Sequence, residues 1–246
     1  MTGAVTNPLT IPGPALVTGA GREREIGTAV CRALAAAGHA VAFTIPPGGD
    51  GSALAAELGA EAIEADLAGP AAAGDLLDAA TERLGALPAV LVNNAAHSVN
   101  GGYAEMDGAT LDAHYAVNVR APMLLSALLA RAGRPGRIVN LISGQFLGPM
   151  PGELAYTASK GALEAFTRQL SAEVAHLGIT VNAVGPGPND TGWIDDDLRA
   201  ELLPRFPMGR VGRPEDAATL IAWLCSEDCS FTTAGVFDLS GGRATY

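Results

Sequence analysis

Short apolar runs rich in Val, Ile and Leu alternate along this chain with longer amphipathic segments. The short runs are typical of buried strands, and the longer segments place apolar residues three and four apart, which predicts helices. We expect strands over residues 14–17, 40–45, 61–65, 88–93, 138–143, 179–184 and 236–239. Helices are expected over residues 29–38, 52–58, 71–84, 111–132, 153–174 and 214–224. Regular alternation of this kind predicts an α/β fold, a doubly wound parallel sheet of about seven strands with helices on both faces.

The length of the chain fits one such domain. A chain of 246 residues can bury one sizeable core, and its apolar content of 48% favours a compact fold over disorder. No repeat or charged linker divides the sequence, so we expect a single domain over residues 1–246. Within it, residues 1–13 are expected to form a flexible lead-in, and residues 189–207 a helical lid.

Charge and composition exclude several classes of partner. The formal net charge of −11 disfavours binding to nucleic acid or to an anionic membrane. The chain shows no amino-terminal signal pattern and no apolar run of the ~20 residues that span a bilayer, so a cytoplasmic protein is expected. Three cysteines and four scattered histidines lack ligand spacing, so we assign no metal; they are Cys31, Cys225, Cys229, His39, His97, His114 and His176.

One predicted strand ends on a serine hydroxyl, and the predicted helix that follows carries a tyrosine and a lysine. Ser143 closes the apolar run 138–142 and is expected at the carboxyl end of that strand. Tyr156 and Lys160 lie four residues apart in a helical pattern, so the phenol and the ammonium share one face. An ammonium lowers the pKa of a nearby phenol, and a serine hydroxyl can stabilise a carbonyl oxygen. These residue types suit proton transfer to a carbonyl, although a Tyr and a Lys at this spacing also occur in purely structural helices.

A glycine-rich segment follows the first predicted strand. Residues 18–27 read Thr-Gly-Ala-Gly-Arg-Glu-Arg-Glu-Ile-Gly and lead into a predicted helix. Glycines let the backbone approach a diphosphate closely, and the N-terminus of a helix favours negative charge. The segment therefore predicts a nucleotide site of the Rossmann type, with a tight strand-to-helix turn as the plainer alternative.

Taken in order, the motifs of the chain resemble those of the short-chain dehydrogenase/reductase family. They are the glycine-rich segment, Asn93-Asn94-Ala95, Ser143, Tyr156, Lys160 and Pro186-Gly187. The resemblance covers nearly the whole chain and implies hydride transfer between a nicotinamide cofactor and a ketone or secondary alcohol. It implies that Tyr156 is the general acid or base, that Lys160 lowers its pKa and binds ribose, and that Ser143 polarises the carbonyl. Asn118 matches the family's fourth catalytic residue, which bends its helix and supports the proton relay.

The glycine-rich segment departs from the family pattern. The usual Thr-Gly-x-x-x-Gly-x-Gly is two residues shorter, and Glu25 stands where the family has its middle glycine. Longer loops of this kind are similar to those of the enoyl reductases of the same superfamily. Those enzymes separate their Tyr and Lys more widely than Tyr156 and Lys160 are separated, which argues against enoyl reductase activity.

The same resemblance implies a set of cofactor contacts. Asp66 matches an acidic residue that lies against the adenine, although a helix cap explains Asp66 equally well. Pro186 and Gly187 match a turn over the nicotinamide, and Thr191 matches a residue that contacts its carboxamide or the phosphates. The expected cofactor residues are Gly19, Gly21, Arg22, Arg24, Ile26, Asp66, Leu67, Asn93, Ala95, Tyr156, Lys160, Pro186, Gly187 and Thr191.

The end of the second predicted strand bears on the choice of cofactor. An NAD site is expected to place an acidic residue there to bind the ribose diol, but Ile45 and Pro46 carry no carboxylate. Arg22 and Arg24 could instead meet a 2′-phosphate, although neighbouring acidic side chains could also pair with them. We therefore expect NADP(H) in preference to NAD(H).

The substrate pocket is expected between three loops, with Gln145, Pro188 and Trp193 as candidate contacts. We predict a carbonyl reductase or alcohol dehydrogenase that acts on a small molecule. One alternative is a reductase of carrier-bound 3-oxoacyl groups, which the acidic run 195–197 disfavours because that activity predicts a basic pocket mouth. Another is a non-catalytic NADP-binding sensor or partner protein, which the retained Ser, Tyr and Lys disfavour. Family members commonly pair through long helices, so a homodimer or homotetramer is expected.

Overall fold

The structure, a computed structural model, describes residue 11, residues 13–192 and residues 194–242. Its centre is one sheet of seven parallel strands in the order β3-β2-β1-β4-β5-β6-β7. The strands are β1 (Ala15–Thr18), β2 (Val41–Ile45), β3 (Glu61–Glu64), β4 (Val90–Asn93), β5 (Gly136–Leu141), β6 (Ile179–Gly185) and β7 (Val236–Asp238). This is the doubly wound order of a Rossmann fold, so the predicted fold class is confirmed. Each predicted strand is present, with ends that differ by two residues at most.

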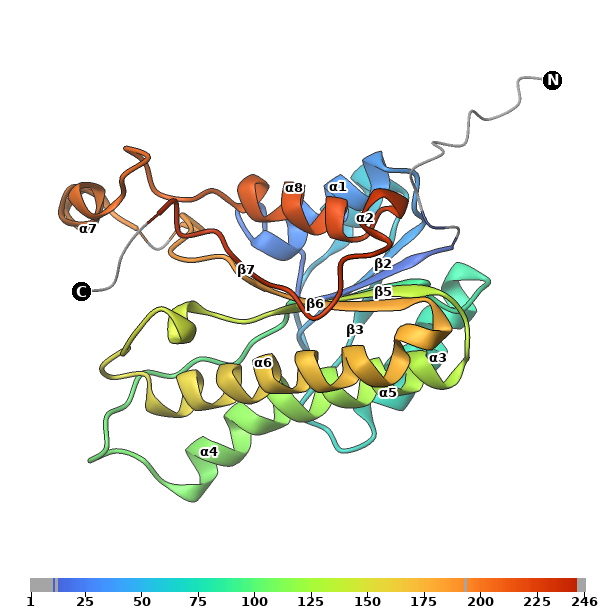
Figure 1. Cartoon of the computed structure of the whole chain (residues 1–246), viewed down its shortest axis with the longest axis horizontal. Coiled ribbons are helices and arrows are strands. Elements are labelled where there is room, and N and C mark those ends of the chain that lie inside the picture. Colours follow the sequence, from blue (N-terminus) through green and yellow to red (C-terminus); the bar gives the residue numbers. More distant parts are fainter. Residues whose placement is uncertain (1–10, 12, 193, 243–246) are drawn as a thin grey trace.

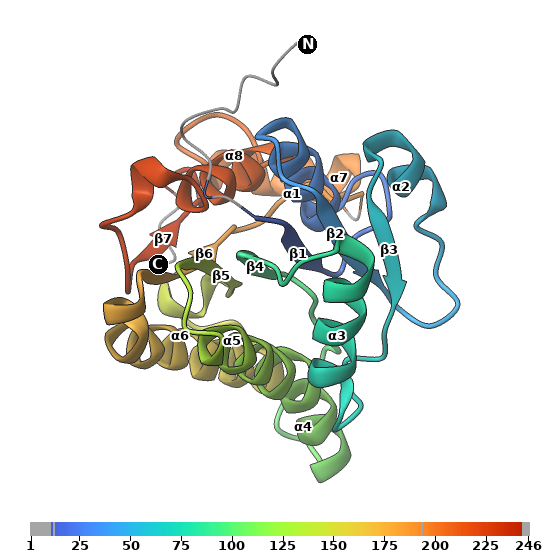
Figure 2. The same cartoon turned by 90° about the vertical axis from the view of Figure 1, so that its right-hand side faces the viewer.

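Helices cover both faces of the sheet (Figure 1). One layer consists of α1 (Ile26–Ala36), α2 (Ser52–Leu58) and α8 (Pro214–Leu224). The other consists of α3 (Ala72–Leu84), α4 (Gly108–Tyr115), α5 (Ala121–Arg131) and α6 (Leu154–Val174). Figure 2 shows the sheet between the two layers. Among the described residues, no helix combines the length and the apolar character needed to cross a membrane.

The central strands are apolar on both sides because both sides are covered. Successive residues of a strand point to opposite faces, so Val17 packs into the core under α1 and α8, whereas Leu16 packs into the core under α3 and α5. Ile11 is also buried in the first of these cores, although it falls within the expected lead-in. Residues 1–10 and 12 lie outside the described residues.

The helix predicted over residues 111–132 is interrupted. It consists of α4, a π-helical turn at Ala116–Arg120, and α5, which begins at Ala121. At the junction, the N–H of Ala121 donates to the carbonyl of Ala116, five residues earlier, in place of the usual four. Such π-turns are rare and often mark functional sites, and this one contains Asn118.

The expected lid segment, residues 189–207, is helical only in part. It contains α7 (Asp196–Leu202) and one 3-10 turn, Leu203–Arg205. The carboxylate of Asp195 accepts the backbone N–H of Leu198 at 2.8 Å and so caps α7. Ile194, Leu202 and Phe206 of this segment form a small core with Val211, which follows it, apart from the buried clusters of the sheet.

Candidate active site

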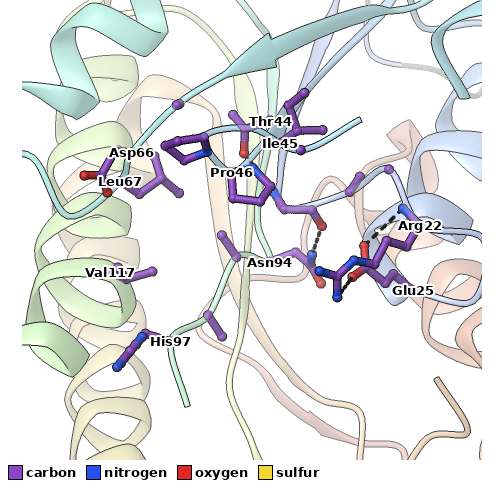
Figure 3. A pocket seen from close by; sticks show the side chains of 18 of the residues that line it. Arg22, Glu25, Thr44, Ile45, Pro46, Asp66, Leu67, Asn94, His97 and Val117 are labelled. Carbon is purple, nitrogen blue, oxygen red and sulfur yellow. Dashed lines mark hydrogen bonds and ion pairs between the residues drawn. The ribbon is translucent and has the colours of Figure 1, made fainter. Parts of the chain in front are cut away.

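A cavity of about 490 Å³ lies beyond the carboxyl ends of β1 to β4 (Figure 3). In an open α/β sheet this edge is where ligands bind. Several of the expected cofactor residues line the cavity, namely Gly19, Gly21, Arg22, Ile26, Asp66, Leu67, Ala95 and Thr191. The structure thus brings together residues from loops that lie far apart in the sequence.

The glycine-rich segment forms a close turn against the end of β4. Gly19 has a φ of +75°, and a Cβ atom there would lie 2.8 Å from the Cα of Ala95. A Cβ atom on Gly27 would lie 2.0 Å from the carbonyl oxygen of Gly19, so only glycine fits. α1 begins at Ile26, which lines the cavity, so the N-terminus of this helix meets the cavity wall. This cradle fits a diphosphate group.

The additional residues of the loop bond to one another at the rim. The backbone N–H of Arg22 donates to Oε2 of Glu25 at 3.3 Å, and the two side chains form an ion pair at 3.6 Å. Glu25, which stands in place of a glycine, therefore turns its carboxylate onto the loop itself, as Figure 3 shows. Arg22 lines the cavity and its side chain is 84% exposed.

Arg24 forms an ion pair with the expected lid segment. Its guanidinium pairs at 2.9 Å with Asp190, and Asp190 also binds Arg199 of α7. The cavity lining includes Arg22 but not Arg24. The pairing partner of Arg24 is therefore the expected lid segment and not a neighbouring acid of its own loop.

Asp50 is a cavity residue that the sequence analysis missed. Its carboxylate accepts the backbone N–H of Ser52 at 2.9 Å, at the start of α2, and this bond lowers its pKa. The analysis considered Ile45 and Pro46 at the strand end, but the turn beyond them brings Asp50 back to the cavity. An Asp two residues before a predicted helix can accept the first backbone N–H of that helix, a signal that could have drawn attention to it.

Asp66 fits both of the readings that its sequence context allowed. It lines the cavity just after β3, and its carboxylate accepts the backbone N–H of Ala68 at 2.9 Å. A residue can cap a turn with one oxygen and face a ligand with the other, so the capping bond does not compete with a role at the adenine.

The two asparagines at the end of β4, Asn93 and Asn94, point in different directions. Asn93 is buried and donates to Oδ1 of Asn140 at 2.8 Å, because the two residues are register partners on β4 and β5. Asn94 lines the cavity instead, and its amide donates at 3.0 Å to the carbonyl of Thr18. Asn93 therefore braces the sheet, while Asn94 ties the glycine-rich segment to β4.

Ser143, Tyr156 and Lys160 converge next to the end of β5. Nζ of Lys160 donates to the carbonyl of Leu141 at 2.8 Å and lies 5.6 Å from the centre of the Tyr156 ring. The Ser143 hydroxyl donates to Sδ of Met150 at 4.0 Å and lies close enough to Tyr156 to lower the pKa of its phenol. The three groups predicted to act together are neighbours, and their catalytic roles stay predictions.

Burial is the largest cause of the pKa shifts of Tyr156 and Lys160. Burial raises the pKa of Tyr156, an effect to which the Glu153 carboxylate adds, while the neighbouring Ser143 hydroxyl lowers it. Burial also lowers the pKa of Lys160, the only lysine of the sequence, to about 8. We expected Lys160 to lower the pKa of Tyr156, but that pKa is raised. Removal from water disfavours both the phenolate of Tyr156 and the ammonium of Lys160.

Asn118 joins the cavity wall to the helix that carries Tyr156. Its side chain accepts the N–H of His97 at 2.7 Å and donates to the carbonyl of His97 at 2.8 Å. It also donates to Oγ of Ser159 at 2.9 Å, and that hydroxyl donates to the carbonyl of Tyr156 at 2.6 Å. The buried amide thus holds two elements of the site in one arrangement, and it lies in the π-helical turn between α4 and α5.

The expected nicotinamide turn lies at the end of β6, away from the lining of the cavity. Asn189 donates to the carbonyls of Pro186 and Gly187, at 2.6 and 3.2 Å. Gly187 has a φ of +64°, and a Cβ atom there would lie 3.0 Å from the Cα of Ser240. Pro188 follows in the same half-buried turn.

The expected substrate contacts lie in different environments, and one of them falls outside the described residues. Gln145 is bonded within the protein, to the N–H of Ser143 and to Glu164. Trp193 lies outside the described residues. His97, which the sequence analysis left without a role, lines the cavity and packs edge to face on His114 at 4.7 Å between ring centres.

Known proteins match this arrangement over almost its whole length. A family model described as Enoyl-(Acyl carrier protein) reductase matches residues 19–244. The Uncharacterized oxidoreductase YjdA of Bacillus subtilis is 45% identical over 240 residues, which cover 93% of this chain and 95% of the relative.

Two solved structures are similar in fold and in sequence. A blue fluorescent protein from a metagenomic library, in complex with NADPH, has a TM-score of 0.87 and 34% identity, covering 95% of this chain and 98% of that protein. The acetoin dehydrogenase of Enterobacter cloacae has a TM-score of 0.84 and 31% identity, covering 95% of this chain and 96% of that protein.

Proposed function

Because this chain is a member of the short-chain dehydrogenase/reductase family of oxidoreductases, we propose that it transfers a hydride between NADP(H) and a small ketone or secondary alcohol. The observation that supports this most is that Ser143, Tyr156 and Lys160 lie next to one another at the end of β5. When bound, the nicotinamide supplies or accepts the hydride.

The side chains of the protein transfer the proton that accompanies the hydride. In the direction of reduction, Tyr156 gives its proton to the carbonyl oxygen, and the Ser143 hydroxyl stabilises the negative charge on that oxygen. The Lys160 ammonium stabilises the phenolate that remains, which requires that this buried amine be protonated. Asn118 acts on the geometry, because its bonds hold His97 and the Tyr156 helix in place.

Tyr156→Phe tests this proposal directly. The variant should lose turnover and retain NADPH binding, because the ring stays and the transferable proton is gone. The assay follows NADPH oxidation with a panel of small ketones that includes acetoin, the substrate in the name of one structural neighbour. Turnover by Tyr156→Phe at the wild-type rate would contradict the role of the phenol. Tight NADPH binding with no turnover of any ketone by the wild type would favour the sensor alternative.

NADP(H) is the proposed cofactor because Arg22 lines the cavity and the end of β2 carries no carboxylate. Asp50 favours NAD(H) instead, since a carboxylate at the cavity suits the ribose diol of NAD(H) better than the 2′-phosphate of NADP(H). Arg22→Ala should reduce the preference for NADPH over NADH by about tenfold, the effect of one exposed charge-assisted bond, and Asp50→Asn should increase it. A wild-type preference for NADH would contradict the proposal.

A carrier-bound acyl substrate is the second candidate, and the name of the matching family model favours it. The pocket rim disfavours it, because Arg24 and Arg199 both pair with Asp190 and Asp195 to Asp197 are acidic. Comparison of a free 3-oxoacyl thioester with the same group on its carrier separates the two candidates, since a carrier reductase should prefer the carrier form.

Three further expectations are proposals as well. We propose that residues 189–207 close over the substrate and that the protein acts in the cytoplasm. We also propose a homodimer or homotetramer that pairs through the long helices. Light scattering on the purified protein measures its mass in solution, and a monomer would contradict the last of these.

A further inference from the structure

Gln145 connects the backbone of Ser143 to the helix that carries Tyr156. It lies in the 3-10 turn Gly144–Phe146, directly after Ser143. Its Oε1 accepts the backbone N–H of Ser143 at 2.9 Å, and its Nε2 donates to Oε2 of Glu164 at 3.1 Å. The amide that the sequence suggested as a substrate contact is thus bonded at both ends within the protein.

Glu164, the partner of Gln145, lies on the same face of α6 as Tyr156 and Lys160. It lies one helical turn beyond Lys160 and two beyond Tyr156, so the three side chains share one side of the helix. Its side chain is 19% exposed, and its other oxygen accepts a hydrogen bond from Arg168 at 3.1 Å. A half-buried carboxylate with a cationic neighbour is a fixed acceptor for the Gln145 amide.

The connection matters because Ser143 lies beyond the regular strand. β5 ends at Leu141, where Nζ of Lys160 binds the carbonyl at 2.8 Å. Two residues later, the Ser143 N–H is held by Gln145 and not by a neighbouring strand. The strand end is therefore tied to α6 on both sides of Ile142, once through Lys160 and once through the Gln145–Glu164 bond.

We propose that Gln145 and Glu164 are positioning residues that hold Ser143 in place beside Tyr156. The inference rests on the proposed function, since it assigns Ser143 its place in that reaction. The direction of a serine hydroxyl follows its backbone, and a displacement of about 1 Å at a reacting group can reduce the rate about a hundredfold. Loss of the connection should therefore slow the chemical step and leave substrate binding largely unchanged.

Exchanging the two side chains tests the bond itself. Gln145→Glu sets two carboxylates against each other, whereas Gln145→Glu/Glu164→Gln restores one donor and one acceptor in the reverse order. Gln145→Glu should reduce kcat about 10- to 100-fold with KM changed by less than about threefold, and the double variant should recover most of kcat. Gln169→Glu, the same change at an exposed position of α6, is the matched control and should behave as wild type.

A second background separates positioning from general damage. If Gln145 acts through Ser143, then Gln145→Glu should cause almost no further loss in a Ser143→Ala protein. An equal loss in both backgrounds would overturn the proposal, as would a rise in KM at unchanged kcat, which is the signature of a substrate contact. Failure of the double variant to recover would also overturn it, provided that its thermal unfolding and NADPH affinity match the wild type.

Hydrogen exchange gives a readout that needs no turnover. Exchange of the Ser143 amide, measured by mass spectrometry, should be faster in Gln145→Glu and should return to the wild-type rate in the double variant. Unchanged exchange in Gln145→Glu would overturn the positioning role. If the wild type reduces no ketone, the proposed function fails, while the exchange rates still decide whether this connection exists.

Discussion

The two halves of the site are built in different ways. At the nucleotide side, charged side chains lie at an open rim, where the Arg22 guanidinium is 84% exposed and 3.6 Å from its acidic partner. At the catalytic side, Asn118, Ser159 and Lys160 are fully or almost fully buried, and each is hydrogen-bonded. Exposed ion pairs contribute about 0 to 1 kcal/mol each, whereas a broken buried bond costs about 1 to 3 kcal/mol. The nucleotide side is thus built to admit a large ligand, whereas the catalytic side is built to hold a few atoms in place.

The largest effect is expected from Lys160→Met, which removes the buried amine and should abolish turnover. The folded pKa of Lys160 is lowered from 10.5 to about 8. Between these two pH values the unfolded chain holds a proton that the folded chain has released, so the stability of the wild type rises with pH. Relative to Lys160→Met, the wild type should gain about 3 kcal/mol from below pH 8 to above pH 10.5. Urea unfolding of both proteins at each pH measures this gain, and parallel pH profiles would contradict the buried, shifted amine.

A smaller effect is expected from Asn118→Ala. The substitution removes the bonds to both backbone groups of His97 and to Ser159, and it leaves buried polar groups without partners. We expect a loss of about 2 to 4 kcal/mol in the free energy of unfolding, together with slower turnover. Denaturant unfolding and steady-state kinetics test this. A loss below about 1 kcal/mol would show that the catalytic half is less rigid than its contacts indicate.

The smallest effect is expected from Asp190→Asn, at the rim. It weakens the pairs with Arg24 and Arg199, both on exposed side chains, so stability should fall by less than about 1 kcal/mol and the difference should shrink in high salt. Thermal unfolding at two salt concentrations is the measurement. A salt-independent loss as large as that of Asn118→Ala would remove the distinction between the two halves.

The sequence predicts most of the fold because its signals are local. Apolar runs and glycine stops place every strand, and the order of motifs places Ser143, Tyr156 and Lys160 together. What it could not predict depends on the direction of side chains after distant elements meet. The register of β4 and β5 turns Asn93 into the sheet, and the fold of the lid segment gives Arg24 a partner in Asp190. Burial, which no local pattern measures, decides the pKa of Lys160.

Lys160, the only lysine of the sequence, makes this protein unusually simple to observe. Isotopic labelling of lysine would give a single side-chain resonance, and its chemical shift against pH would report the pKa of about 8 without any assignment by mutation. Amine-directed reagents would find one side-chain target, which is buried behind the end of β5. The rate of their reaction with Lys160 would measure how often the structure around this amine opens to water.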